Sequence, residues 1–402
     1  MFVVVKLVQS VWGRATRARR TPLLTLAMVA GLGLAGCDPV AVSGNPGLGV
    51  DTSAAVPVAL LVPGGSGQAS DELLARSLEN AARLAISDLQ GAKIDLRVYN
   101  TSGQAAIAAD AATRAVNDGA RIVLGPLYAE EANAVGVALA GRNVNVLSFS
   151  NNTDIAGGNV FVLGSTFQNT ANRLVRYAAA QGKPRIAIVY DETQAGQTGR
   201  RAIEQAAASN GASIAGVGSY PFSQEGVIAA VPGIASMIRS TGADAVIFTS
   251  DTAGALPLIT QLLSENQVDP AVTRYIGLTR WDVPAGTLSL PGVQNGWFAL
   301  PDPTLTQQFG SRYAAAYGAA PHPIAGLAYD GIAAIGALVK AGKSNALSTS
   351  GLTQSTGFVG VNGVFRLRAD GTNERGLAVA QIRNNQVIVI DPAPRAFGGA
   401  GF

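Results

Sequence analysis

Apolar positions along the chain alternate between two spacings. Short runs of neighbouring apolar, often β-branched residues predict strands, and the stretches between them repeat apolar residues every three or four positions, as helices do. The first series predicts strands at 58–62, 94–99, 122–124 and 144–149, with helices over 74–89, 104–118 and 129–140. Because strand–helix–strand units form parallel sheets with helices on both faces, this region is predicted to be α/β.

The alternation then starts again. A second series predicts strands at 185–190, 213–218, 245–249 and 274–277, with helices over 196–210, 225–241 and 254–266. A glycine, Gly119 or Gly242, precedes a strand in each series and is typical of a helix end. Two Rossmann-like lobes are therefore expected. Two late helices, 304–318 and 324–341, precede antiparallel ribbons within 358–365, 377–382 and 386–390.

The chain begins with the layout of a secretory signal. Four arginines between Arg14 and Arg20 precede an apolar stretch at 23–36, which is too short for a permanent membrane span. Leu34-Ala35-Gly36-Cys37 resembles the lipobox of bacterial lipoproteins, which implies cleavage after residue 36 and lipid on the Cys37 thiol. The alternative is an uncleaved anchor with a chance cysteine. We expect a periplasmic protein anchored by lipid, and Asp38 favours the inner membrane over the outer membrane.

The ends of the mature chain look loose. Residues 37–55 are small, polar and rich in Gly and Pro, so we expect a flexible tether there. Residues 393–402 are expected to form a loose tail.

Composition excludes several functions. Only 14% of residues are charged and 48% are hydrophobic, which argues against a disordered chain. Without the five basic residues of 1–36, the remaining 24 basic and 26 acidic residues leave a net charge of −2, so nucleic-acid binding is not expected. A single cysteine and a single histidine, His322, exclude an intramolecular disulfide and a His-based metal cluster. We expect no cofactor, no metal and no catalysis.

Polar residues follow the predicted strands and could contact a small polar ligand. The candidates are Ser66, Tyr128, Ser148, Ser150, Asn151, Asp251, Trp281 and Tyr329. Trp281 could equally pack within a lobe, and Tyr329 could belong to the core. Glu130 and Glu131 could form a cation site, or could simply be acids in the first turn of a helix, where the helix dipole favours them.

Several local motifs occur in the order and spacing of one family. They include Gly125-Pro126-Leu127, the strand 185–191, the segment 325–330 and the ribbon 357–365. Over about 56–392 the chain resembles type I periplasmic binding proteins, specifically the leucine/isoleucine/valine-binding family of ABC transporters. The resemblance implies no enzyme activity, but a solute, of amino-acid or amide type, bound between two lobes and delivered to an ABC permease. It implies a three-strand hinge, a first lobe of 56–163 and 299–345, and a second lobe of 164–298 and 346–392.

The chain departs from the pattern of that family. A ligand-binding serine of the family is replaced by Ala129-Glu130-Glu131, and a tyrosine by Ala195. Asp251 or Asp282 could supply the acid of the second lobe. The chain also resembles lipoprotein activators of penicillin-binding proteins on the same fold, and a penicillin-binding protein is the alternative partner.

The lipid anchor can be tested at its only cysteine. Because the thiol is the acylated group, Cys37→Ser should abolish incorporation of labelled fatty acid and release the protein from membranes or block its processing. Membrane fractionation and intact mass would measure both effects. A variant with unchanged mass and unchanged membrane association would contradict the lipoprotein assignment.

Overall fold

The computed structural model describes residues 46–398. The expected signal sequence, Cys37 and the start of the tether lie outside the described residues. Within the described part, no helix is both long and apolar enough to traverse a bilayer.

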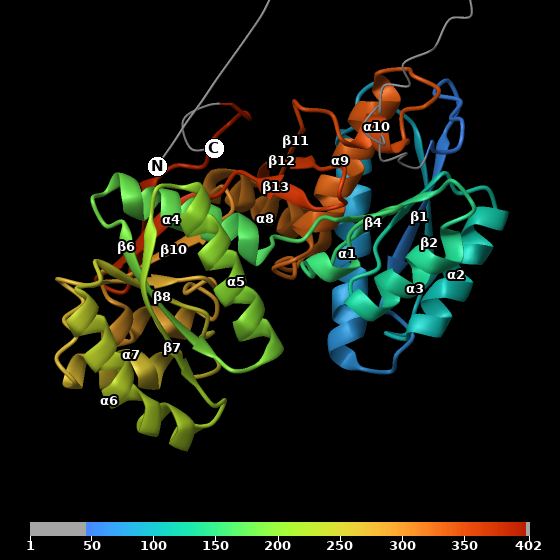
Figure 1. Cartoon of the computed structure of the whole chain (residues 1–402). Helices are drawn as coiled ribbons and strands as arrows, with labels where there is room; N and C mark the ends of the chain where they lie inside the picture. Colours follow the sequence, from blue (N-terminus) through green and yellow to red (C-terminus); the bar gives the residue numbers. More distant parts are fainter. Residues whose placement is uncertain (1–45, 399–402) are drawn as a thin grey trace, which may run out of the picture. The chain divides into compact units, whose positions relative to one another are not determined.

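A five-stranded parallel sheet forms the first lobe (Figure 1). Its order is β2-β1-β3-β4-β5, with β1 (Val56–Val62), β2 (Ile94–Asn100), β3 (Ile122–Leu124), β4 (Asn145–Ser148) and β5 (Val160–Val162). The helices α1 (Ala69–Asp88) and α9 (Gly326–Lys340) pack together, as do α2 (Ala105–Asn117) and α3 (Ala129–Leu139). Side chains along β1 alternate between the two faces of the sheet. Val58 and Leu60 pack in the core with α1 and α9, and Ala59 packs on the other face in the core with α2 and α3.

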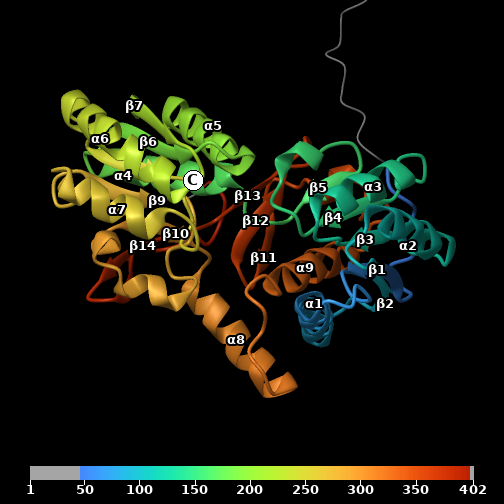
Figure 2. The same cartoon turned by 90° about the horizontal axis from the view of Figure 1, so that it is seen from below.

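A seven-stranded sheet forms the second lobe. Its order is β15-β14-β10-β9-β8-β6-β7, and only β14 runs opposite to the other strands, pairing antiparallel with both β10 and β15. The strands are β6 (Arg185–Asp191), β7 (Ser213–Tyr220), β8 (Ala245–Phe248), β9 (Arg274–Gly277), β10 (Trp297–Leu300), β14 (Ala378–Arg383) and β15 (Gln386–Asp391). The helices α4 (Phe167–Ala180) and α5 (Gln194–Ser209) share one core, and α6 (Gln224–Thr241) and α7 (Leu256–Glu265) share the other. Figure 2 shows helices on both faces of each sheet.

The remaining elements connect the lobes or cover their ends. They are α8 (Pro303–Tyr317), α10 (Thr349–Leu352), a small antiparallel sheet of β11 (Phe358–Gly360), β12 (Gly363–Leu367) and β13 (Asn373–Arg375), and the 3-10 turns η1 (Thr153–Ile155), η2 (Ala285–Ser289) and η3 (Pro291–Val293). The chain passes between the lobes three times: after β5, after β10 and after β13. We call these three crossing segments the hinge.

The hydrophobic cores of the lobes place two of the lobe boundaries at residues other than those expected from the sequence. Leu300 lies in the core of the second lobe, so the second crossing follows residue 300 rather than 298. Leu352, Phe358 and Phe365 pack in the core of the first lobe, although 346–392 was expected in the second lobe. The third crossing therefore lies near residue 376, because Ala378 is the next residue to join the core of the second lobe.

Both ends of the described part are more ordered than expected. Val50 is buried and its N–H donates to the Ser344 carbonyl oxygen at 2.8 Å, so the expected tether is docked on the first lobe at this point. Ala393 is buried in the second lobe, and the Arg366 guanidinium lies 4.5 Å from the centre of the Phe397 ring. Two residues of the expected loose tail, Ala393 and Phe397, thus contact the folded lobes.

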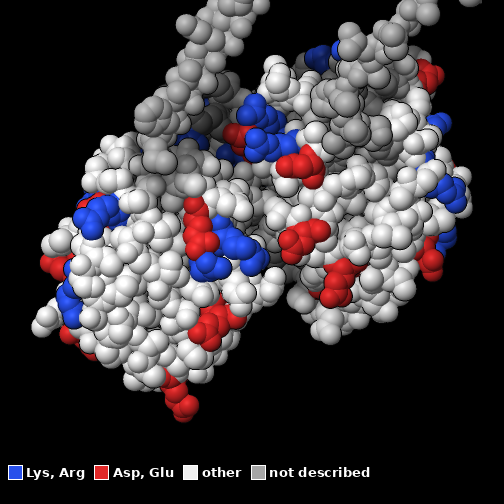
Figure 3. Space-filling model, viewed as in Figure 1, with Lys and Arg blue, Asp and Glu red and all other residues white. Residues whose placement is uncertain are grey.

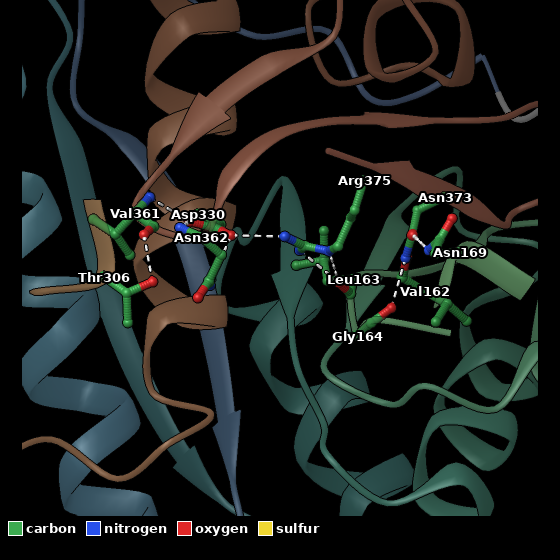
Figure 4. A network of polar contacts seen from close by, with 10 residues as sticks. All are labelled: Val162, Leu163, Gly164, Asn169, Thr306, Asp330, Val361, Asn362, Asn373 and Arg375. Atoms are coloured by element: carbon green, nitrogen blue, oxygen red, sulfur yellow. Dashed lines mark hydrogen bonds and ion pairs between the residues drawn. The ribbon is translucent and has the colours of Figure 1, made fainter. Parts of the chain in front are cut away.

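A buried ion pair joins the hinge to the first lobe (Figure 4). Asp330 on α9 is fully buried, and Arg375 at the end of β13 donates to it at 3.0 Å. Asp330 also accepts the Val361 N–H at 2.8 Å, the Asn362 backbone N–H at 3.4 Å and the Asn362 side-chain amide at 3.0 Å. Arg375 also donates from Nε and Nη2 to the Leu163 carbonyl oxygen, at 2.9 and 2.6 Å. One guanidinium thus links the first crossing, the third crossing and α9.

Further hydrogen bonds extend this network to the second lobe. The Asn373 amide donates to the Val162 and Gly164 carbonyl oxygens at 2.7 and 2.8 Å, and it accepts from the Asn169 amide of α4 at 2.6 Å. Thr306 on α8, which follows the second crossing, donates to the Val361 carbonyl oxygen at 3.4 Å. All three crossings therefore contact one polar network (Figure 4).

Breaking the buried pair should be costly. Asp330→Asn leaves the Arg375 charge buried without its counter-ion, and we expect a loss of about 3–5 kcal/mol in the free energy of unfolding. Glu79→Gln, which breaks the exposed Glu79–Arg83 pair, should cost less than about 1 kcal/mol and is the matched control. Urea unfolding measures both, and equal losses in the two variants would contradict the role given to Asp330.

The single histidine should make stability depend on pH. Burial lowers the pKa of His322, whose Nδ1 accepts the Ile324 N–H at 3.4 Å just before α9. As pH falls below the ordinary histidine pKa of about 6.5, the unfolded chain binds a proton at His322 more readily than the folded chain does. The free energy of unfolding therefore decreases as pH falls through this range. His322→Gln should flatten the dependence of the urea midpoint between about pH 5.5 and 7. An unchanged slope would mean that other groups cause it.

Candidate binding cleft

Two pockets between the lobes share the residues Asn151 and Phe167. Asn151 follows β4 of the first lobe, and Phe167 begins α4 after the first crossing. Other lining residues follow β8 and β9, so the pockets lie at the carboxyl ends of parallel strands. This is where open α/β sheets place ligands.

The first of these, which we call the apolar pocket, has a volume of about 530 Å³. Side chains of both lobes and of the hinge line it, including Phe167, Leu278, Val283, Ile324 and Leu327. Such a lining suits a ligand with an apolar body, while a few polar groups fix its orientation.

Four polar groups of the apolar pocket can provide that orientation. Arg280 forms a two-point pair with Asp282, at 2.9 and 2.5 Å, and Asp251 accepts the Gly254 N–H at 2.6 Å through one carboxylate oxygen. Asn151 lies opposite on the first-lobe side. Arg375 commits three of its five N–H groups to Leu163 and Asp330, so the hinge arginine keeps donors for a ligand. Arg280 and Arg375 thus offer N–H donors to a ligand, while their charges are paired with Asp282 and Asp330.

The second pocket, which we call the polar pocket, has a volume of about 570 Å³. The loop after β4 contributes Asn152 and Asp154, and α5 contributes Gln194, Thr198 and Arg201. Figure 3 shows basic and acidic side chains beside one another on the second-lobe rim of the hollow between the lobes, and acidic side chains on the first-lobe rim.

Two of the residues expected from the sequence lie together. Asn151 and Asp251 both line the apolar pocket, one from each lobe. Ser148 is fully buried and its hydroxyl donates to the Pro126 carbonyl oxygen at 3.0 Å, while the Ser150 hydroxyl accepts the Asn152 N–H at 3.1 Å. Both serines shape the loop that presents Asn151, and neither lines the apolar pocket.

The two aromatic candidates of the later chain lie elsewhere. Trp281 is fully buried in the second lobe, 6.4 Å from the Phe248 ring, and a Cβ at Gly277 would come within 2.2 Å of its indole nitrogen. Glycine at 277 therefore makes room for the ring, which packs rather than binds. Tyr329 faces a different hollow, where its hydroxyl donates to Asp88 at 2.6 Å.

Ser66 and Tyr128 lie together in a fourth hollow, formed by the first lobe alone. Tyr128 precedes α3, and its loop passes close to β1 at Gly125. A Cβ at Gly125 would lie 2.3 Å from the Leu61 carbonyl oxygen, and its φ of 88° also favours glycine.

Sequence reasoning missed Phe167, Thr279, Arg280, Arg375 and the polar-pocket residue Arg201. Thr279 and Arg280 directly follow β9, so the same end-of-strand rule that selected Asp251 could have found them. Phe167 and Arg375 come from crossing segments, and no local pattern marks such residues before the chain is folded.

Comparison with known proteins identifies the class of protein that this fold and cleft define. Residues 55–386 match the family model described as periplasmic binding protein, and the chain belongs to that family. It is a family of binding proteins and not of enzymes. No curated protein sequence gives a significant match.

Solved structures share the type I periplasmic binding fold. A Rhodospirillum rubrum protein assigned as a branched-chain amino acid ABC transporter has a TM-score of 0.71 and 18% identity, covering 84% of this chain and 100% of its own. A Desulfitobacterium hafniense ABC transporter substrate-binding protein in complex with Leu has a TM-score of 0.62 and 18% identity, covering 84% and 100%. An ABC transporter solute binding protein of Rhodopseudomonas palustris BisB5 in complex with 3,4-dihydroxy benzoic acid has a TM-score of 0.57 and 15% identity, covering 85% and 97%.

Proposed function

We propose that this protein is the lipid-anchored solute receptor of an ABC-type uptake system. It would be held at the periplasmic face of the inner membrane by acyl chains on Cys37. The observation that carries the proposal is the apolar pocket, because both lobes and the hinge residue Arg375 line it. A ligand that contacts both lobes stabilises their closed arrangement, and a permease could read that arrangement.

The chemistry of the pocket narrows the solute. Arg280 and the remaining donors of Arg375 suit a carboxylate, and the apolar lining suits a hydrocarbon body. The structures in complex with Leu and with 3,4-dihydroxy benzoic acid contain ligands of this kind. We therefore propose an amino acid or a related organic acid, with Asn151 and Asp251 contacting its polar groups.

Calorimetry with leucine and benzoate as probes tests the proposal. Asn151→Ala removes one neutral hydrogen bond, contributing about 0.5–1.5 kcal/mol, and should weaken binding by roughly two- to tenfold. Thr113→Ala is the matched control, because it removes one neutral hydrogen bond of the first lobe within α2, outside both pockets, and should leave affinity unchanged. If neither probe nor any other amino acid or aromatic acid binds at millimolar concentration, the receptor proposal fails.

One observation favours a second candidate, a non-enzymatic activator of a penicillin-binding protein. Ala129 and Ala195 stand where the amino-acid binders have a ligand-contacting serine and tyrosine, so the cleft need not hold a solute. An activator would use an outer surface instead. Binding to a purified penicillin-binding protein, together with an empty cleft in calorimetry, would favour this candidate.

A further inference from the structure

The amino ends of the parallel strands of the first lobe form an edge of the lobe that is opposite the cleft. We call it the tether edge, and its segments are 47–55, 91–93, 118–121, 140–144 and 340–348. The chain enters the lobe here, because the Val50 N–H donates to the Ser344 carbonyl oxygen and a Cβ at Gly47 would lie 2.8 Å from the Ser348 Cα. Figure 1 shows the first described residues and α10 at the same end of this lobe. Gly47 lies ten residues after Cys37, so lipid on Cys37 would turn this edge towards the bilayer.

Basic side chains gather at the tether edge. Lys93 and Arg121 directly precede β2 and β3, and Arg142 lies shortly before β4. Lys340 ends α9, and Lys343 follows three residues later. Three of the four lysines that follow residue 37 therefore belong to this edge. The chain after residue 36 has a net charge of −2, so these cations are concentrated here against the overall balance of charge.

The three lysines lie close to the point at which the chain enters the lobe. A Cβ at Gly91 would come within 3.7 Å of the Lys340 Cε, so the Lys340 side chain extends over the turn that precedes Lys93. Lys343 directly precedes Ser344, the residue whose carbonyl oxygen holds the incoming chain. All three lysines are exposed.

The cations of the tether edge are not neutralised by the protein. Within residues 46–398, none of its five basic residues forms an ion pair. Asp51 and Asp118 are the acids of these segments, which leaves an excess of about three positive charges. Lys340 lies in the last turn of a helix, where the helix dipole favours a cation. Stabilisation of a helix end therefore accounts for Lys340 but not for the other four.

We propose that the tether edge is a membrane-docking surface, on which Lys93, Lys340 and Lys343 contact the headgroups of anionic phospholipids. Basic side chains close to an anionic bilayer are attracted to its surface, and exposed lysines without counter-ions are free to make this contact. The proposal rests on the lipid anchor proposed above, which brings this edge to a bilayer, and is independent of the solute. Docking would leave the cleft open, because no segment of the tether edge lines the apolar or the polar pocket.

Fluorescence quenching in reconstituted vesicles tests the proposal. The lipidated protein is inserted into phosphatidylcholine vesicles that contain a nitroxide-labelled lipid, either without or with about one third phosphatidylglycerol. Because Cys37 is the only native cysteine and its thiol is acylated, Ala341→Cys places a single dye on the tether edge. Ala271→Cys, which is exposed just before β9 on the equivalent edge of the second lobe, is the matched control. Phosphatidylglycerol should increase quenching severalfold for the first dye only, and about 0.5 M sodium chloride should abolish the increase by screening.

Charge variants identify the residues that dock. Each lysine near an anionic surface should contribute roughly fivefold to the docking equilibrium, so Lys340→Gln should weaken it by about that factor. The triple variant Lys93→Gln, Lys340→Gln and Lys343→Gln should weaken it roughly a hundredfold and leave leucine affinity unchanged. Lys183→Gln removes the one lysine of the second lobe and should leave docking unchanged.

Flotation of the same vesicles distinguishes failure of docking from failure of the anchor. If the protein floats with phosphatidylcholine vesicles but phosphatidylglycerol does not increase quenching of the tether-edge dye, docking alone is overturned. Docking is also overturned if both dyes are quenched equally, or if the triple variant docks like the wild type. Protein that does not float overturns the anchor and the docking proposal together.

Discussion

The ion pair between Asp330 and Arg375 is the constraint on which the arrangement of the hinge depends. Its side chains are 0% and 3% exposed, so neither charge is compensated by water. Each therefore requires its partner, and the backbone groups that complete the network are held in place with them. Those backbone groups, from Leu163 to Asn362, belong to segments far apart in the sequence. The pair fixes where these segments meet more than it adds net stability, because burying two charges offsets much of their attraction.

The position of Arg375 in the hinge also determines part of the chemistry of the cleft. Arg375 belongs to the buried network and also lines the apolar pocket, so a group that binds there contacts the hinge itself. Asn151 and Asp251 lie on opposite sides of the apolar pocket. Each follows a strand of its own lobe, and the two positions are equivalent in the two similar sheets. The two lobes thus contribute to one pocket through the same feature of α/β architecture, while the crossing segments contribute what neither lobe has alone.

Much of the fold could be predicted from spacing of apolar residues, and the failures have physical reasons. The strand β9 was predicted with its observed bounds, and most other elements differ by only one or two residues at their ends. The strand β5 was missed although its three residues, Val160 to Val162, are all apolar and buried. The helix α4 was missed although Ala171, Leu174, Val175 and Ala178 repeat at helical spacing and are all buried. The assignment of residues 346–367 to the wrong lobe came from a family resemblance and not from the chain, whose apolar residues do not reveal which core they join.

The site was harder to predict than the fold for a related reason. A polar residue after a strand can point into the cleft, as Asn151 does, or hold its own loop, as Ser148 does, and the two have the same sequence signal. Trp281 shows the same ambiguity for an aromatic residue, because only the space above Gly277 decides that it is buried.

The docking of Val50 on the first lobe limits how far the protein can travel. Val50 lies thirteen residues beyond Cys37, and a chain of that length spans at most about 45 Å when fully extended. If Cys37 carries lipid, the first lobe stays within a thin layer above the membrane and does not diffuse through the whole compartment. Within such a layer the concentration of the protein near a membrane partner is set by geometry and not by the number of copies in solution. Weak contact with that partner is then sufficient, and the protein can release it quickly after each encounter.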